Sequence, residues 1–112
     1  MKVMICGSRG YDDLDSVRAF VRSLPRGAII VTGGALGVDR AAEDEADAIG
    51  LQATVMLPDW KAFGRSAGPL RNQQMVDTCD WGVAFWDGGS PGTKDSIARL
   101  KRAGKFREVG AA

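Results

Sequence analysis

The chain has 112 residues, the size of one domain, and its 15 basic and 14 acidic residues give a net charge of +1. This balance disfavours a protein built mainly to coat nucleic acid, and the absence of histidine excludes histidine-based acid–base catalysis and histidine-ligated zinc sites. No apolar run reaches the roughly 20 residues of a membrane span, and the first residues do not resemble a signal peptide. Cys6 and Cys79 lie in apolar segments, as reduced core cysteines do. We therefore expect a cytoplasmic protein with no metal, no cofactor and no membrane partner.

Strands alternate with helices along the whole chain. Short apolar runs predict four strands at residues 3–6, 28–32, 52–57 and 81–86, and a run at residues 106–109 would add a fifth. Apolar stripes at steps of three and four predict helices that begin near Asp12 or Asp13, Asp39, Pro69 and Thr93. The stretch at residues 58–68 has neither pattern, and we expect it to be irregular.

The inward faces of these helices follow from the same spacing. We expect the sheet to be covered by Leu14, Val17, Val21 and Leu24 of the first helix, by Val38, Ala42, Ala46 and Ile49 of the second, and by Asn72, Met75, Val76 and Cys79 of the third. The alternation predicts an α/β fold: a Rossmann-like three-layer sandwich with a mostly parallel sheet of four or five strands. In such a sheet the loops after the strands meet at one edge, where ligands bind.

The turn after the second strand is rich in glycine and opens a helix. Gly33, Gly34 and Gly37 can expose backbone N–H groups beside a helix N-terminus, which is a suitable seat for a phosphate. The alternative is that the glycines only permit a tight turn and that Asp39 only caps the helix. The spacing matches neither standard nucleotide-binding glycine motif.

Several side chains in the expected edge loops suit a phosphorylated ligand. Arg71, expected in the first turn of its helix, could make a forked contact with phosphate, or it could pair with Asp59 or Asp77. Asp39 or Asp87 could accept a hydrogen bond from a ribose hydroxyl. Trp60, in the irregular loop, is the tryptophan best placed to stack on a base. The basic residues after Thr93 are typical of a solvated helix face.

Four motifs occur in order: Gly7-Ser8-Arg9, Gly33-Gly34-Ala35-x-Gly37-x-Asp39, Gly68-Pro69-x-Arg71-Asn72 and Phe85-Trp86-Asp87-Gly88-x-Ser90-x-Gly92-Thr93. Together they resemble the SLOG superfamily, specifically its small stand-alone branch related to YspA and YpsA. That superfamily also includes the lonely-guy phosphoribohydrolases and the Rossmann domain of DNA-processing protein A. The resemblance implies a Rossmann-like domain over residues 1–112 that binds nucleotides or nucleotide derivatives, and by family analogy a homodimer.

Only some of the motif residues of the phosphoribohydrolases are present in this sequence. Arg71 matches their helix arginine, but Asn72 replaces the lysine of their arginine–lysine pair. Gly92 and Thr93 match their phosphate loop, while Ser96 falls on the position of the glutamate that assists bond cleavage. The resemblance therefore implies phosphate binding without the family's acid. The residues expected at the site are Gly7, Ser8, Arg9, Gly33, Gly34, Ala35, Gly37, Asp39, Trp60, Arg71, Asn72, Asp87, Gly88, Ser90, Gly92 and Thr93.

These observations favour a binding protein for a nucleotide or nucleotide derivative, acting as a sensor or carrier. Two alternatives stay open. One is a phosphoribohydrolase-like enzyme in which Asp95, Asp87 or Asp39 replaces the missing glutamate. The other is a single-stranded nucleic-acid-binding module, which the near-neutral net charge disfavours.

Overall fold

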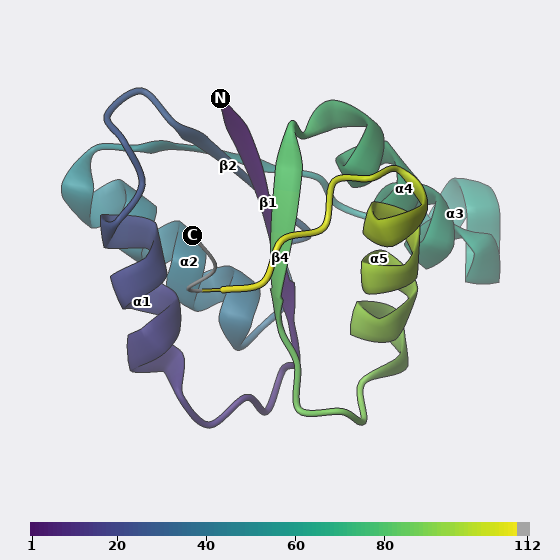
Figure 1. Cartoon of the computed structure of the whole chain (residues 1–112). Helices are drawn as coiled ribbons and strands as arrows, with labels where there is room; N and C mark the ends of the chain where they lie inside the picture. The colour runs from purple at the N-terminus through teal and green to yellow at the C-terminus, as the bar shows by residue number, and fades with distance from the viewer. Residues whose placement is uncertain (110–112) are drawn as a thin grey trace.

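A computed structural model describes residues 1–109 of the chain and shows a four-stranded, entirely parallel sheet (Figure 1). The strands are β1 (Lys2–Gly7), β2 (Ile29–Thr32), β3 (Gln52–Val55) and β4 (Trp81–Phe85), in the spatial order β3-β2-β1-β4. In register, Val3 lies between Ile30 of β2 and Trp81 of β4. The central strand β1 is buried on both faces, which explains its continuous apolar run.

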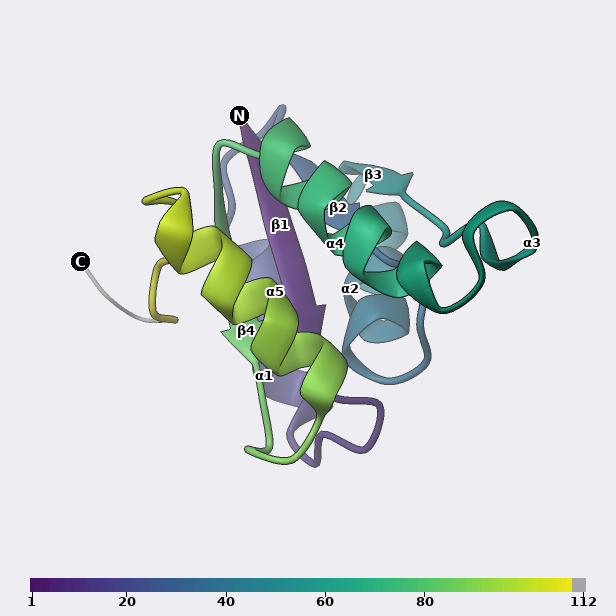
Figure 2. The ribbon, with the colours of Figure 1, turned by 90° about the vertical axis from the view of Figure 1, so that its right-hand side faces the viewer.

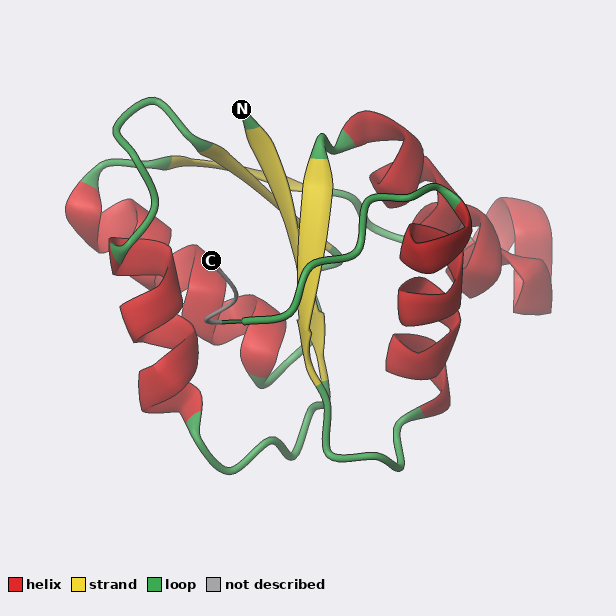
Figure 3. Ribbon diagram, viewed as in Figure 1, coloured by secondary structure: helices red, strands yellow, loops and turns green. Residues whose placement is uncertain are grey.

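Helices cover both faces of the sheet. Figure 3 shows one pair of helices on each side of the strands. The first pair is α1 (Leu14–Arg22) and α2 (Val38–Ile49), and the second is α4 (Ala67–Thr78) and α5 (Pro91–Arg102). The predicted three-layer Rossmann-like fold with a parallel sheet is therefore confirmed, with four strands. None of the helices in residues 1–109 is long and apolar enough to cross a membrane.

Each face of the sheet has its own apolar core. Val17 and Val21 of α1 and the small residues of α2 pack with Val3, Ile5 and Val83 on one face. Met75, Val76 and Cys79 of α4 and Leu100 of α5 pack on Met4 and Val31 on the other. The small side chains of α2 let this helix lie close to the strands, as the sequence predicts.

Local signals at the helix ends behave as expected. The side chain of Asp13 accepts a hydrogen bond from the N–H of Ser16 at 3.1 Å and caps α1. Gly50 ends α2 in the left-handed conformation, with φ of 81°. The backbone therefore turns into β3 at the residue that the sequence indicates.

Four sequence-based expectations are wrong. Ile49 does not face the sheet, since its side chain is 43% exposed at the last turn of α2. The stretch expected to be irregular contains the short helix α3 (Trp60–Phe63), which Asp59 caps, and a 3-10 turn (Gly64–Ser66). Because α4 already begins at Ala67, Arg71 lies in its second turn and not in its first.

The fourth wrong expectation is the additional strand at residues 106–109. Within the described residues only one isolated bridge forms there, between Gly82 and Phe106. The N–H of Gly82 donates to the carbonyl of Lys105, and the N–H of Arg107 donates to the carbonyl of Gly82, each at 2.9 Å, so the chain is held against β4 at this one position. The sheet thus ends at β4, with a short backbone strap along its edge.

The strand order places a topological switch point between β1 and β4. From β1 the chain continues to β2 on one side, while β4 lies on the other side. The helices that follow β1 and β4, α1 and α5, lie on opposite faces of the sheet, which leaves a crevice at the carboxyl edge. Figure 2 shows β1 near the centre of the molecule, visible between the helices α4 and α5.

Candidate functional site

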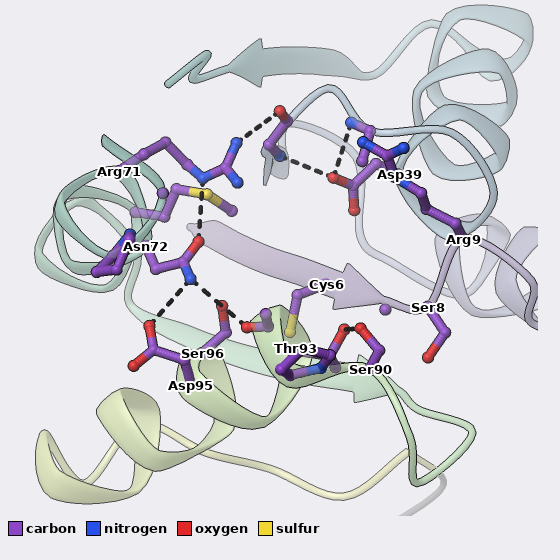
Figure 4. A pocket seen from close by; sticks show the side chains of 18 of the residues that line it. Cys6, Ser8, Arg9, Asp39, Arg71, Asn72, Ser90, Thr93, Asp95 and Ser96 are labelled. Carbon is purple, nitrogen blue, oxygen red and sulfur yellow. Dashed lines mark hydrogen bonds between the residues drawn. The ribbon is translucent and has the colours of Figure 1, made fainter. Parts of the chain in front are cut away.

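A pocket of about 840 Å³ occupies this edge of the sheet. Figure 4 shows it between α4 and α5 on one side and the turn that leads into α2 on the other, with the end of β1 as its floor. Its volume lies in the range of small-molecule sites. It is lined by four segments distant in sequence, namely residues 6–10, residues 33–39, the region from Trp60 to Met75, and the region from Asp87 to Ser96.

The carboxylate of Asp39 occupies the glycine turn after β2. Its Oδ2 atom accepts hydrogen bonds from the N–H of Gly33 at 3.2 Å and of Ala35 at 3.1 Å. The N–H of Gly33 is one that the sequence predicts as a phosphate donor, and Ala35 is among the expected site residues. The carboxylate of Asp39 therefore binds these two N–H groups, where an anionic ligand could otherwise bind. A ligand phosphate needs other donors.

The environment of Asp39 raises the pKa of its carboxyl group. The residue is only 6% exposed. Burial raises the pKa of Asp39 from 3.8 to about 6; the Ala35 and Gly33 N–H groups and Arg71 act against this shift, while Glu43 adds to it. Glu43, one turn along α2, is held by the Thr32 hydroxyl at 2.7 Å. A carboxyl group that titrates near neutral pH in a ligand-sized pocket is typical of functional sites.

Arg71 is fastened to the backbone of the same turn. Its Nη1 donates to the carbonyl of Gly33 at 2.8 Å and to that of Met56 at 3.4 Å, and its Nε donates to Oδ1 of Asn72 at 3.0 Å. A forked contact with phosphate uses two neighbouring N–H groups, and here the fold already uses two of the three nitrogens. Only Nη2 has no partner within residues 1–109. Arg71 is therefore a structural clamp with one group left for a ligand.

Asn72 joins α4 to α5. Its Nδ2 donates to Oδ2 of Asp95 at 3.0 Å and to the carbonyl of Gly92 at 3.5 Å. Arg99 also binds Oδ2 of Asp95, at 2.8 Å. Burial raises the pKa of Asp95, but hydrogen bonds from Arg99 and Asn72 outweigh it and lower that pKa overall. Asp95 is thus an ionised member of a polar network and a poor proton donor near neutral pH.

The N-terminus of α5 is open toward the pocket. Ser90, at its N-cap, makes no side-chain capping bond, and the N–H groups of Gly92 and Thr93 have no partner within the described chain. The hydroxyls of Ser90 and Thr93 lie 3.1 Å apart at the same place. Unpaired N–H groups and hydroxyls at the positive end of a helix form an anion site.

Hydrogen bonds from backbone N–H groups to the side chains of Asp87 and Ser8 shape the loops at this end of the pocket. Asp87 folds its loop by accepting from the N–H groups of Gly89 and Ser90, and these bonds, that from Gly89 foremost, lower the pKa of Asp87. The buried hydroxyl of Ser8 accepts from the N–H of Asp87 at 3.1 Å and so ties the loop after β4 to the loop after β1. Asp87 and Ser8 therefore act on the shape of the loops.

The pocket brings together most of the residues expected at the site. Thirteen line it: Gly7, Ser8, Arg9, Gly33, Ala35, Asp39, Trp60, Arg71, Asn72, Asp87, Ser90, Gly92 and Thr93. The other three, Gly34, Gly37 and Gly88, do not. Gly34 and Gly37 have positive φ, and a side chain at Gly37 would clash with the carbonyl of Arg9. For these two glycines the alternative of a purely conformational role is the better explanation.

Several residues that line the pocket are not among the site residues expected from the sequence. Cys6 and Met75 belong to core stripes that also reach the pocket, and their pattern gives no sign of a ligand. Ser96 is 3% exposed, lines the pocket and has no side-chain partner among residues 1–109. Its helical spacing of four residues from Gly92 could have placed it on the same face of α5. The described residues contain no cluster of three or more metal-binding side chains.

Comparisons with known proteins agree with this architecture. The Rossmann-like fold matches DNA processing protein A from Streptococcus pneumoniae, with a TM-score of 0.83 and 19% identity over 99% of this chain and 50% of that one. It also matches DNA processing protein A from Helicobacter pylori, whose structure was described for its single-stranded DNA binding mode, with a TM-score of 0.80 and 20% identity over 100% and 66%. The chain thus spans half to two thirds of these proteins.

Sequence comparisons are more specific. The chain is 33% identical over 116 residues to the Gene 61 protein of Mycobacterium phage D29, covering 92% of this chain and 90% of that protein. The model of the YspA, cpYpsA-related SLOG family, called YAcAr, matches residues 1–63. This match spans more than half of the chain and includes both glycine turns after β1 and β2, so the chain belongs to the YspA, cpYpsA-related SLOG family.

Proposed function

We propose that this protein binds a nucleotide or nucleotide-derived small molecule in the pocket at the carboxyl edge of its sheet. The observation that carries the proposal is the open N-terminus of α5, where two N–H groups without a partner in residues 1–109 and the hydroxyls of Ser90 and Thr93 converge. These groups bind phosphate oxygens without needing a lysine or a metal ion. The rest of the pocket has room for a sugar and a base, and Trp60, 59% exposed at its rim, offers a face for stacking.

Binding, as distinct from hydrolysis, agrees with the charges of the site. Of the three carboxylates considered as replacements for the family's glutamate, Asp87 shapes its loop and Asp95 pairs with Arg99. Asp39 is fixed by two N–H groups through one oxygen. Ser96, at the family's glutamate position, carries no charge and cannot stabilise a developing positive charge as a carboxylate does.

The experiment is a calorimetric titration of the protein with the four common 5′-mononucleotides and with the corresponding nucleosides. We expect the mononucleotides to bind at least tenfold more tightly, because only they can use the α5 N-terminus. Equal affinity for nucleosides and mononucleotides would refute the proposal. So would binding of oligonucleotides alone, with an affinity that falls steeply with salt as many counterions are released.

Gly92→Asp separates binding from folding. Gly92 is the second residue of α5, its φ is not positive, and a Cβ there would meet nothing within 4 Å. An acidic residue in the first turn favours the helix by about 0.3–1 kcal/mol, yet it places a negative charge where the phosphate would bind. We therefore expect equal or higher stability together with loss of mononucleotide binding. Ala98→Asp, which makes the same charge change on an exposed position of α5, should bind normally.

A further inference from the structure

Asp39 and Arg71 form an unusual pair across the pocket. The same residue, Gly33, donates its N–H to Asp39 and offers its carbonyl to Arg71. Among the described residues the two side chains make no ion pair within 4.0 Å, although each one influences the pKa of the other. Gly33 thus holds a buried carboxylate and a half-buried guanidinium close together but out of direct contact.

Each member of the pair has one group that the fold does not use. Asp39 Oδ1 and Arg71 Nη2 have no hydrogen-bond partner within residues 1–109, and both side chains line the pocket. Figure 4 shows them approaching it from two sides of the same turn. Asp39 is only 6% exposed, yet no fully buried side-chain nitrogen or oxygen among the described residues lacks a hydrogen-bond partner, so Oδ1 and Nη2 are both open to the pocket. A ligand in the pocket can therefore bind both atoms.

The complementary ligand group must donate to a carboxylate and accept from a guanidinium. The charges of Asp39 and Arg71 oppose each other, so a charged group gains little net attraction from the pair, and a neutral group that both donates and accepts suits it best. Two adjacent hydroxyls meet these conditions, since one can donate while its neighbour accepts. In a nucleotide such hydroxyls are on the sugar, which is joined directly to the phosphate, and the Asp39–Arg71 pair and the α5 N-terminus line one pocket.

We propose that Asp39 and Arg71 together recognise the vicinal 2′- and 3′-hydroxyls of a ribose, which makes the site selective for ribonucleotides over deoxyribonucleotides. This inference rests on the proposed function, because the phosphate of the same ligand is placed at the α5 N-terminus. It adds the sugar class to that function. It also sets the site apart from one that binds DNA, whose sugars lack the 2′-hydroxyl.

The test compares each of the four 5′-ribonucleotides with its 2′-deoxy counterpart by calorimetry at pH 7.5. A charge-assisted hydrogen bond corresponds to roughly 10- to 100-fold in affinity, so we expect the ribonucleotide of each pair to bind at least tenfold more tightly. In Asp39→Asn, the amide can keep the two bonds to Gly33 and Ala35 but cannot present a carboxylate oxygen to the sugar. The ribose preference should therefore fall to threefold or less. Asp44→Asn, on the exposed face of the same helix, should keep the wild-type preference.

The pH dependence gives an independent readout that does not rely on a variant. The charged or titratable groups that act on Asp39 are Glu43 of α2, Arg71 of α4 and Cys6 of β1. As the pH rises from 5 to 7.5, Asp39 ionises, and the ratio of ribonucleotide to deoxyribonucleotide affinity should rise with it. The 5′-phosphate titrates equally in both members of a pair, so its effect cancels. The ratio should not change with pH in Asp39→Asn.

The possible outcomes separate this inference from the proposed function. If mononucleotides bind better than nucleosides but ribose and deoxyribose forms bind equally, the Asp39–Arg71 assignment is wrong and the proposed function stands. Discrimination among the four bases without a sugar preference would likewise overturn it, since the pair would then read a base edge. If phosphate adds nothing to binding, the proposed function fails and the inference fails with it. Thermal unfolding of Asp39→Asn confirms that the variant is folded in each comparison.

Discussion

Replacing Asp39 by asparagine should change how the stability of the fold depends on pH. The Asp39 carboxyl group is 6% exposed and accepts two hydrogen bonds through Oδ2. Burial raises the pKa of this carboxyl from 3.8 to about 6. In Asp39→Asn the amide oxygen can accept the same two bonds, while the titrating group is removed. The difference between the two proteins therefore reports the ionisation of this one side chain.

The sign and size of the effect follow from linkage. A group whose pKa is raised by folding contributes its full stability below its unfolded pKa, and this contribution is lost as the pH rises through the folded value. A rise from 3.8 to about 6 corresponds to about 3 kcal/mol, at 1.36 kcal/mol for each pH unit. The free energy of unfolding of the wild type, relative to that of Asp39→Asn, should thus fall by about 2.5 kcal/mol between pH 4 and pH 7, because a small part of the full effect is already lost at pH 4.

Urea unfolding of both proteins at half-unit steps from pH 4 to pH 7.5 measures this difference. Asp44→Asn, exposed on the same helix, controls for the general effect of removing one carboxylate and should parallel the wild type. Two results would refute the reasoning. A difference independent of pH would mean that Asp39 titrates normally. A wild type that gains stability relative to the variant as the pH rises would mean that pairing with Arg71 lowers the pKa of Asp39.

Further predictions concern the turn and the clamp. Gly33→Ala should lower the free energy of unfolding by about 1–3 kcal/mol, because a Cβ would lie 2.6 Å from Nη1 of Arg71. Gly10→Ala is the matched control, since a Cβ there would meet no atom within 4 Å. Equal effects of the two substitutions in urea unfolding would contradict this prediction. Gly37→Ala should destabilise more than Gly33→Ala in thermal melts, since it combines φ of 79° with a clash against the backbone of Arg9. Arg71→Lys should lower the free energy of unfolding by about 1–3 kcal/mol, because the hydrogen bonds to Gly33 and Asn72 are lost. An unchanged unfolding curve would instead favour the prediction from the sequence that Arg71 serves only to bind the ligand. Incubation with 5′-mononucleotides should release no free base over many turnovers, since Ser96 is not an acid near neutral pH; steady release that disappears in Asp39→Asn would favour the enzyme alternative.

Much of the fold could be predicted because its signals are local. The buried central strand appears as a continuous apolar run, and Asp13 and Gly50 mark helix ends by their own hydrogen bonding and backbone conformation. The residues that line each helix stripe follow from a period of 3.6. Two of the four errors occurred where a tertiary contact decided the outcome. Whether the segment near Phe106 pairs for one residue or several depends on the edge of β4, and the partial exposure of Ile49 depends on where α2 ends against the sheet.

The site divides in the same way. Its loops could be identified from the sequence because parallel strands bring their carboxyl ends to one edge, and the glycines, hydroxyls and arginine of those loops indicate phosphate chemistry. Only the tertiary structure decided which group uses which partner. Gly33 and Ala35 give their N–H groups to Asp39, and Arg71 gives two of its nitrogens to the fold. Such assignments depend on distances of about 3 Å between residues up to 38 positions apart, and composition, periodicity and spacing along the chain carry no information about them.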